Sequence, residues 1–319
     1  MKLQTNITLQ KQSHHLIDYH SNILLLGSCF SENIGEKFNY FKFQSLQNPF
    51  GILYHPKAIE NFILNTINEK EYDKTDVFFH NERWHCFDAH SDMSCSSKED
   101  LLHNLNESVK KTNQQINKSS HIIITLGTAW AYRFIESDKI VANCHKVPQK
   151  KFLKQIQWVK SIIESLEAII ELIKSVNPKT SIIFTVSPVR HIKDGFVENT
   201  QSKSHLITAI HQVLSPPANS RGLYYFPSYE IMMDELRDYR FYADDMLHPN
   251  RTAVDYIWEH FQNVWISSQS IEIMKEVEGI QKALNHRPFN KESEQYKTFL
   301  DNLELQKSNL KMKIPHIKF

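Results

Sequence analysis

A short apolar run that ends on small residues constrains the fold of this chain most. Residues 23–26 are four consecutive aliphatic residues, and Gly27, Ser28 and Cys29 follow them directly. Such a run is typical of a strand buried on both faces of a parallel sheet. Ser31, which precedes two acidic residues, predicts the N-terminus of a helix just beyond. The sequence therefore predicts that a buried strand delivers the Cys29 thiol to the start of a helix.

The predicted position of Cys29 favours a reactive thiolate. The unpaired N–H groups and the positive dipole end of a helix N-terminus stabilise negative charge, either on a thiolate or on an oxyanion that forms nearby. We therefore expect a low pKa for the Cys29 thiol. A buried structural cysteine after a strand would have the same local sequence. This motif therefore indicates a catalytic thiol only together with a second catalytic motif.

A second motif lies near the other end of the chain. Asp245 and His248 are three residues apart and stand just before an amphipathic run at residues 252–258. In a tight turn ahead of a helix, this spacing lets the carboxylate hold one imidazole nitrogen while the other faces a nucleophile. Together with Cys29, the pair predicts a nucleophile, a base and a residue that orients the base.

Between the two motifs, short apolar runs alternate with helical stretches. We expect strands at residues 121–126, 181–186 and 224–226 and a helix over residues 152–176. This alternation predicts an α/β fold with a doubly wound, mostly parallel sheet. Ligands of such sheets bind beyond the carboxyl ends of the strands, where Gly27, Gly127 and Ser187 would lie.

Two segments stand apart from this alternation. Residues 72–97 predict an inserted hairpin that covers the pocket, and an amphipathic helix from Ser268 leads into a polar, lysine-rich tail. We therefore predict an α/β domain over residues 1–268 and a C-terminal helical appendage over residues 269–319.

Composition excludes several classes of function. The net charge is +1 and no long basic run is present, which argues against a nucleic-acid substrate or an anionic membrane surface. No apolar run reaches transmembrane length, and the four cysteines lack a paired Cys-x-x-Cys spacing. These features predict a cytoplasmic protein with reduced thiols, no cofactor and no structural metal.

Five spaced motifs resemble those of the GSCFA-domain proteins, which are similar to the SGNH (GDSL-like) hydrolases. The resemblance covers the chain up to the helix after His248 and implies a three-layer flavodoxin-like fold with hydrolase chemistry. It also implies that Cys29 takes the nucleophile position, with Ser28 as the alternative if the register shifts by one residue. Asp245 and His248 match the Asp-x-x-His block of those hydrolases. The five motifs lie at residues 27–30, 48–51, 127–130, 143–148 and 187–191.

The resemblance implies less about the oxyanion hole. Gly51 falls at the oxyanion glycine, but Ala129 stands where the hydrolases carry an asparagine. Thr128, Asn48 and Asn143 are the candidate replacement donors. His145, in a shared motif, and Arg190, whose guanidinium can clamp a carboxylate or phosphate, are candidate pocket residues.

Three classes of function compete. The first is an acyl-ester hydrolase, or an acyltransferase, that acts on a small acylated molecule or saccharide. The second is a metal site built from Cys29, Cys144, His145 and His248, although the short paired spacings of structural zinc sites are missing. The third is a catalytically idle protein that uses the same pocket to bind a small molecule. We favour the hydrolase; the sequence names no substrate and leaves the oligomeric state open.

Overall fold

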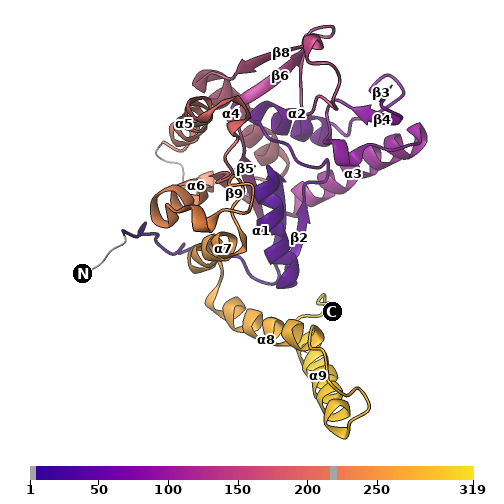
Figure 1. The fold of residues 1–319 in the computed structure, drawn as a ribbon, viewed down its shortest axis with the longest axis vertical. Helices are drawn as coiled ribbons and strands as arrows, with labels where there is room; N and C mark the ends of the chain where they lie inside the picture. The colour runs from indigo at the N-terminus through magenta and orange to yellow at the C-terminus, as the bar shows by residue number, and fades with distance from the viewer. Residues whose placement is uncertain (1–4, 216–220) are drawn as a thin grey trace.

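The computed structural model describes residues 5–215 and 221–319 (Figure 1). Within these residues, the central feature is a five-stranded parallel sheet with the order β10-β9-β5-β1-β2. The predicted buried strands are confirmed, and three of them lie at the centre of the sheet, where both faces are covered. The strands of this sheet are β1 (Asn22–Gly27), β2 (Gln44–Gln47), β5 (His121–Leu126), β9 (Ser181–Val186) and β10 (Leu223–Tyr225).

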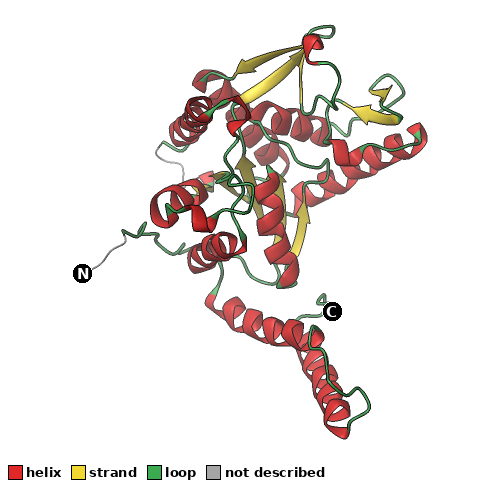
Figure 2. Ribbon diagram, viewed as in Figure 1, coloured by secondary structure: helices red, strands yellow, loops and turns green. Residues whose placement is uncertain are grey.

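Helices cover both faces of this sheet and make the three-layer α/β sandwich that the resemblance implies (Figure 2). Successive residues of a strand point to opposite faces. Leu24 and Leu26 therefore pack against α2 to α5, while Ile23 and Leu25 pack against α1 and α7. The first layer contains α2 (Pro56–Ile67), α3 (Lys98–Lys118), α4 (Val159–Val176) and α5 (Phe196–Val213); the second contains α1 (Cys29–Tyr40), the short α6 (Ser228–Glu230) and α7 (Arg251–Trp265).

A second, antiparallel sheet corrects one prediction. The helix expected over residues 152–176 begins only at Val159, because residues 152–156 form a strand. The apolar residues of this strand continue the period of the helix that follows, so the pattern merged the two elements. The small sheet has the order β7-β6-β8 and stands between β5 and α4 in the chain. Its strands are β6 (Trp130–Phe134), β7 (Lys139–Val141) and β8 (Phe152–Ile156).

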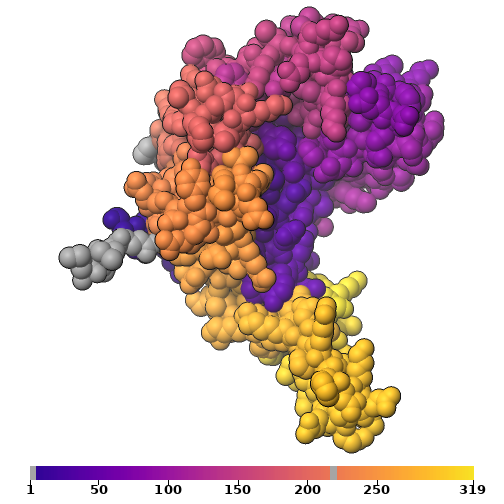
Figure 3. Space-filling view, viewed as in Figure 1, coloured from indigo at the N-terminus to yellow at the C-terminus, as the bar shows by residue number. Residues whose placement is uncertain are grey.

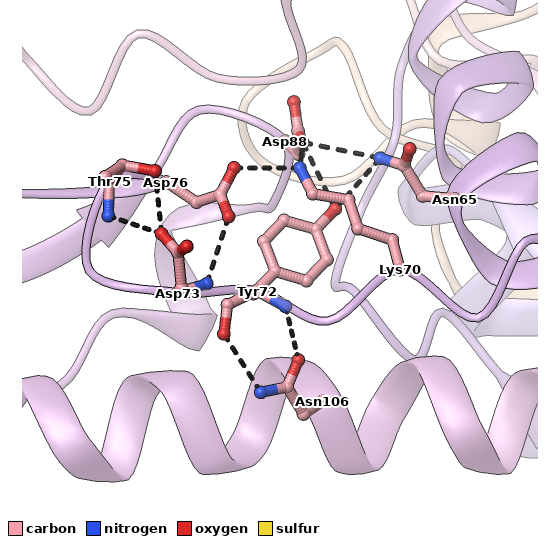
Figure 4. Close-up of polar contacts among 8 residues, drawn as sticks. All are labelled: Asn65, Lys70, Tyr72, Asp73, Thr75, Asp76, Asp88 and Asn106. Atoms are coloured by element: carbon pink, nitrogen blue, oxygen red, sulfur yellow. Dashed lines mark hydrogen bonds and ion pairs between the residues drawn. The ribbon is translucent and has the colours of Figure 1, made fainter.

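The hairpin predicted over residues 72–97 is confirmed as the antiparallel pair β3 (Val77–His80) and β4 (Arg83–Cys86). A polar network holds the loop that leads into it (Figure 4). The Tyr72 hydroxyl donates to Asp88 at 3.1 Å, and the Tyr72 backbone exchanges two hydrogen bonds with the side chain of Asn106 on α3. These bonds fix the hairpin to the helical layer.

The C-terminal segment forms an arm that extends away from the body (Figure 3). It consists of α8 (Ser268–Leu284), which the sequence predicts, and α9 (Glu294–Lys313). The helix α9 replaces the expected polar tail, since Leu303 and Leu310 are buried in the same apolar cluster as Val277 of α8. Over the ranges that the structure describes, no helix has both the length and the apolar character needed to cross a membrane.

Candidate active site

The turn after β1 brings Ser28 and Cys29 to the carboxyl edge of the sheet. Gly27 has a φ of +130°, and a Cβ there would lie 2.0 Å from the Thr125 carbonyl oxygen, so the turn requires glycine. Helix α1 begins at Cys29, two residues before the predicted start. Ser28 is its N-cap: it is fully buried, and its Oγ accepts a hydrogen bond from the Phe30 amide at 3.3 Å.

The environment of Cys29 corrects the predicted low pKa. Burial raises the pKa of the thiol above its ordinary value, and the nearby Glu32 carboxylate raises it further. Lys203 and the amides of Cys29 and Phe30 lower the pKa, as expected at a helix N-terminus, but they do not outweigh burial. Cys29 is therefore mostly a thiol at neutral pH and needs a base to become a nucleophile.

Lys203 is a functional candidate that the sequence did not reveal. Its side chain from α5 is almost completely buried, and Nζ donates to the carbonyl oxygens of Gly127 and Ser187, both at 2.7 Å. These carbonyls come directly after β5 and β9, so the ammonium joins two neighbouring strand ends. Burial lowers the pKa of Lys203 to about 7, and a Cys29 thiolate would raise it. Within an amphipathic helix pattern, nothing distinguishes such a lysine from a surface one.

The structure brings Asp245 and His248 together as the sequence predicts. Asp245 Oδ2 lies 2.6 Å from His248 Nδ1, and Asp245 Oδ1 accepts from the amides of Leu247 and His248 at 2.9 and 3.0 Å. These bonds lower the pKa of Asp245 to about 2, so the carboxylate is ionised across the neutral range. The Arg190 amide donates to the Leu247 carbonyl at 3.1 Å and ties this turn to the loop after β9.

A pocket of about 560 Å³ opens beside this pair. Four of the predicted site residues line it: Thr128, Asn143, Arg190 and His248. The prediction that the hairpin of residues 72–97 covers the pocket is wrong, because none of these residues is among the described lining residues. The small sheet β6 to β8 contributes to the pocket wall instead. The lining does not include the other six predicted site residues: Ser28, Cys29, Asn48, Gly51, His145 and Asp245.

Two pocket residues connect the lining to Cys29. Burial raises the pKa of the Tyr54 hydroxyl to about 12, and the charge of Cys29 contributes to the shift. Burial lowers the pKa of His191 to about 3, and the charges of Lys203 and His248 contribute. The Tyr54 and His191 rings meet edge to face at 5.8 Å. The two rings therefore lie close enough to interact electrostatically with the Cys29 turn and with the Asp245–His248 pair.

Most candidate oxyanion donors are already engaged. The Gly51 amide donates to the Asn48 carbonyl at 2.7 Å, and the Thr128 amide donates to the Tyr54 carbonyl at 3.0 Å. The Thr128 hydroxyl lies 3.0 Å from Ser202 Oγ and also accepts from the Trp130 amide at 3.1 Å. The methyl group of Ala129 is completely buried in the apolar core, and Ala129 is not among the described residues that line the pocket.

Asn48 differs from these candidates. Its Oδ1 accepts from the Gly27 amide at 2.9 Å, which places the carboxamide next to the turn that carries Cys29. Its Nδ2 is buried and has no hydrogen-bond partner among the residues that the structure describes. A buried donor without a partner is costly, so Asn48 Nδ2 remains a candidate oxyanion donor.

His145 stabilises a loop of the pocket and does not line the pocket itself. His145 is buried; its Nε2 lies 2.7 Å from the Cys86 carbonyl oxygen, and Asn143 Oδ1 accepts from its amide at 2.8 Å. Burial lowers the pKa of His145 to about 4. His145 therefore fixes the loop that carries Cys144 and Asn143. Across residues 5–215 and 221–319, no group of three histidine, cysteine or acidic side chains has the arrangement of a metal site.

Comparison with known sequence families agrees with these motifs. The pattern of the GSCFA family matches residues 22–261, a range that includes Cys29, Asp245 and His248. The chain belongs to the GSCFA family. The pattern of the C-terminal domain of GSCFA domain proteins matches residues 277–319 of this GSCFA chain, where α8 ends and α9 lies. No curated protein matches this chain.

Two solved structures are similar to this GSCFA protein over most of its length. One is a serine-to-alanine mutant of an acetyl esterase with an acetate ion, with 10% identity and a TM-score of 0.36 over 81% of this chain and 99% of that one. The other is a carbohydrate esterase family 3 protein from Talaromyces cellulolyticus, with 10% identity and a TM-score of 0.36 over 80% and 99% of the two chains.

Proposed function

We propose that this GSCFA-family protein hydrolyses an acyl ester, with Cys29 as the nucleophile, His248 as the general base and Asp245 as the residue that orients it. The observation that carries the proposal is the 2.6 Å contact between Asp245 and His248 Nδ1 at the edge of a pocket. Because the carboxylate holds Nδ1, Nε2 remains to accept a proton. A thiol whose pKa is raised by burial needs such a base.

Local geometry supports Cys29 over Ser28 as the nucleophile. The Ser28 hydroxyl is fully buried and already serves as the N-cap of α1. Cys29 is partly exposed and stands at the first helical position, where its thiol meets the backbone amides of Cys29 and Phe30. In the proposed reaction, the thiolate attacks the ester carbonyl, the alcohol leaves with the proton from His248, and water then releases the acid from the thioester.

The proposed oxyanion donors are the Cys29 amide and Asn48 Nδ2. We expect Asn48→Asp to lower ester turnover by a factor of about 10²–10³, because it keeps the Oδ1 acceptor for the Gly27 amide but removes the donor. Asn143→Asp tests the alternative donor with the same chemical change. Steady-state kinetics of both variants decide between the two: a larger loss for Asn143→Asp would assign the donor role to Asn143.

Ester hydrolysis by the native protein tests the function itself. We expect turnover of short-chain acyl esters to increase as the pH rises above 7, because burial raises the pKa of the Cys29 thiol and disfavours its ionisation at neutral pH. Alkylation of Cys29, followed by peptide mass spectrometry, should remove activity in proportion to the modified fraction. Full activity with Cys29 completely alkylated would contradict the proposal.

The engaged amides of Gly51 and Thr128 favour one alternative, a protein that binds a small molecule without turnover. Such a protein would form no covalent adduct with acyl-transfer probes, whereas a small ligand would raise its melting temperature. Transfer of the acyl group to an added alcohol, in place of water, would identify an acyltransferase that uses the same residues.

A further inference from the structure

The pocket beside His248 has a strongly cationic lining. Four basic side chains, which we call the cationic wall, line it: Lys146, Lys154, Arg190 and Lys193. Among the described residues of the lining, Asp194 is the only acidic one. The net charge of the whole chain is only +1, so this local excess of positive charge is a property of the pocket.

Two members of the cationic wall converge from different elements. The charges of Lys193 and Lys154 both lower the pKa of the Cys144 thiol, which burial nevertheless raises to about 11. Lys154 also forms an ion pair with Asp194. Within the described ranges, Lys193 and Lys146 have no ion-pair partner, and both are exposed. An anion beside Cys144 would therefore meet the charge of Lys193, which no carboxylate among the described residues balances.

Arg190 borders the same pocket, but its guanidinium lies among three aromatic rings that line the neighbouring pocket. Its guanidinium carbon lies 5.0, 5.6 and 5.4 Å from the ring centroids of Phe196, Tyr239 and Tyr242. It also donates to the Tyr239 hydroxyl at 3.4 Å. These contacts position the guanidinium without neutralising its charge.

The lining of the pocket also offers an aromatic surface next to these charges. Trp130 and Tyr132 are two residues apart on β6 and line the pocket, while Ala131 points to the opposite face and is completely buried. The Lys154 ammonium lies 5.2 Å from the Trp130 ring centroid and 5.3 Å from that of Tyr132. Both aromatic side chains are half-buried, so a ligand would contact the part of each ring that Lys154 does not cover.

We propose that the ligand of this pocket is an acidic saccharide, whose ring stacks on Trp130 and Tyr132 while its carboxylate or phosphate binds the cationic wall. Charge-assisted hydrogen bonds from lysine and arginine are the strong contacts of such a site. The ester to be cleaved would lie toward His248, which lines the same pocket. The hydrolysis of an acylated acidic saccharide depends on the proposed function, whereas binding of the acidic saccharide does not.

Binding of deacylated sugars tests the inference without any requirement for catalysis. We expect calorimetry to show that methyl glucuronide binds the full chain at least about tenfold more tightly than methyl glucoside, with a preference that weakens as salt is added. Methyl glucoside 6-phosphate, in a third arm, distinguishes a phosphate from a carboxylate preference. Lys146→Gln and Lys193→Gln should each reduce the preference for the anion, whereas Lys118→Gln, which removes the same charge from an exposed site on α3, should leave it unchanged.

The outcomes separate the inference from the proposed function. Equal binding of the charged and neutral sugars, or an equal effect of Lys118→Gln and Lys193→Gln, would overturn the inference, and so would the absence of binding by all three sugars. Selective binding of an anionic sugar without hydrolysis of its acetyl ester would support the inference and contradict the hydrolase. Equal kcat/KM values for the acetyl esters of methyl glucuronide and methyl glucoside would support the hydrolase and contradict the inference.

Discussion

Replacing Asp245 with asparagine is expected to lower the turnover of an acyl ester by a factor of about 10⁴, with little change in KM. In this variant an NH₂ group replaces the carboxylate oxygen that lies 2.6 Å from His248 Nδ1. The NH₂ group donates to Nδ1 and so favours the tautomer with the proton on Nε2, which cannot act as a base. The other side-chain oxygen can still accept the amides of Leu247 and His248, so the turn should keep its shape. Steady-state kinetics and circular dichroism measure the two effects separately.

The neighbouring Asp244 provides a matched control. It is exposed like Asp245, and Asp244→Asn removes the same charge one residue away. We expect the Asp244→Asn protein to keep its turnover, and the double variant Asp245→Asn/His248→Gln to be little worse than His248→Gln alone, because residues that act as a unit are not additive. Turnover that survives in Asp245→Asn would exclude the carboxylate from the mechanism, whereas loss of the folded state would identify a structural role.

Cys29→Ala should abolish ester turnover, whereas Ser28→Ala should retain it and lose stability. The thiol of Cys29 is the group that forms the proposed acyl intermediate, while the hydroxyl of Ser28 caps α1. Loss of an N-cap hydroxyl costs about 1 kcal/mol in the free energy of unfolding. Urea unfolding of both variants and their ester kinetics test this division of roles. Inactive Ser28→Ala together with active Cys29→Ala would reverse it.

The central sheet could be predicted from the sequence because its strands are buried on both faces. Residues 121–126 and 181–186 are strongly apolar short runs, and this pattern is characteristic of parallel strands between helices. The contact between Asp245 and His248 was also predictable, since it is local in sequence. These features depend on neighbouring residues and need little information about long-range packing.

The features that the sequence concealed depend on tertiary packing. The apolar residues of strand β8 continue the helical spacing of the apolar residues of α4, so the pattern predicted one helix over both elements. The pKa of Cys29 reflects its burial as well as its place at a helix N-terminus, and only burial decides the direction of the shift. Lys203 has the sequence appearance of a surface residue, yet the strand ends of β5 and β9 enclose it.

The most direct test of the proposed mechanism is the location of a covalent acyl group. An acyl ester with a good leaving group is mixed with the full chain, the reaction is stopped with acid after a few turnovers, and peptide mass spectrometry locates the added mass. We expect one acyl group on Cys29, released by hydroxylamine as a thioester is, and a longer-lived adduct in His248→Gln. An acyl group on Ser28, or turnover without any acylated peptide, would contradict Cys29 as the nucleophile.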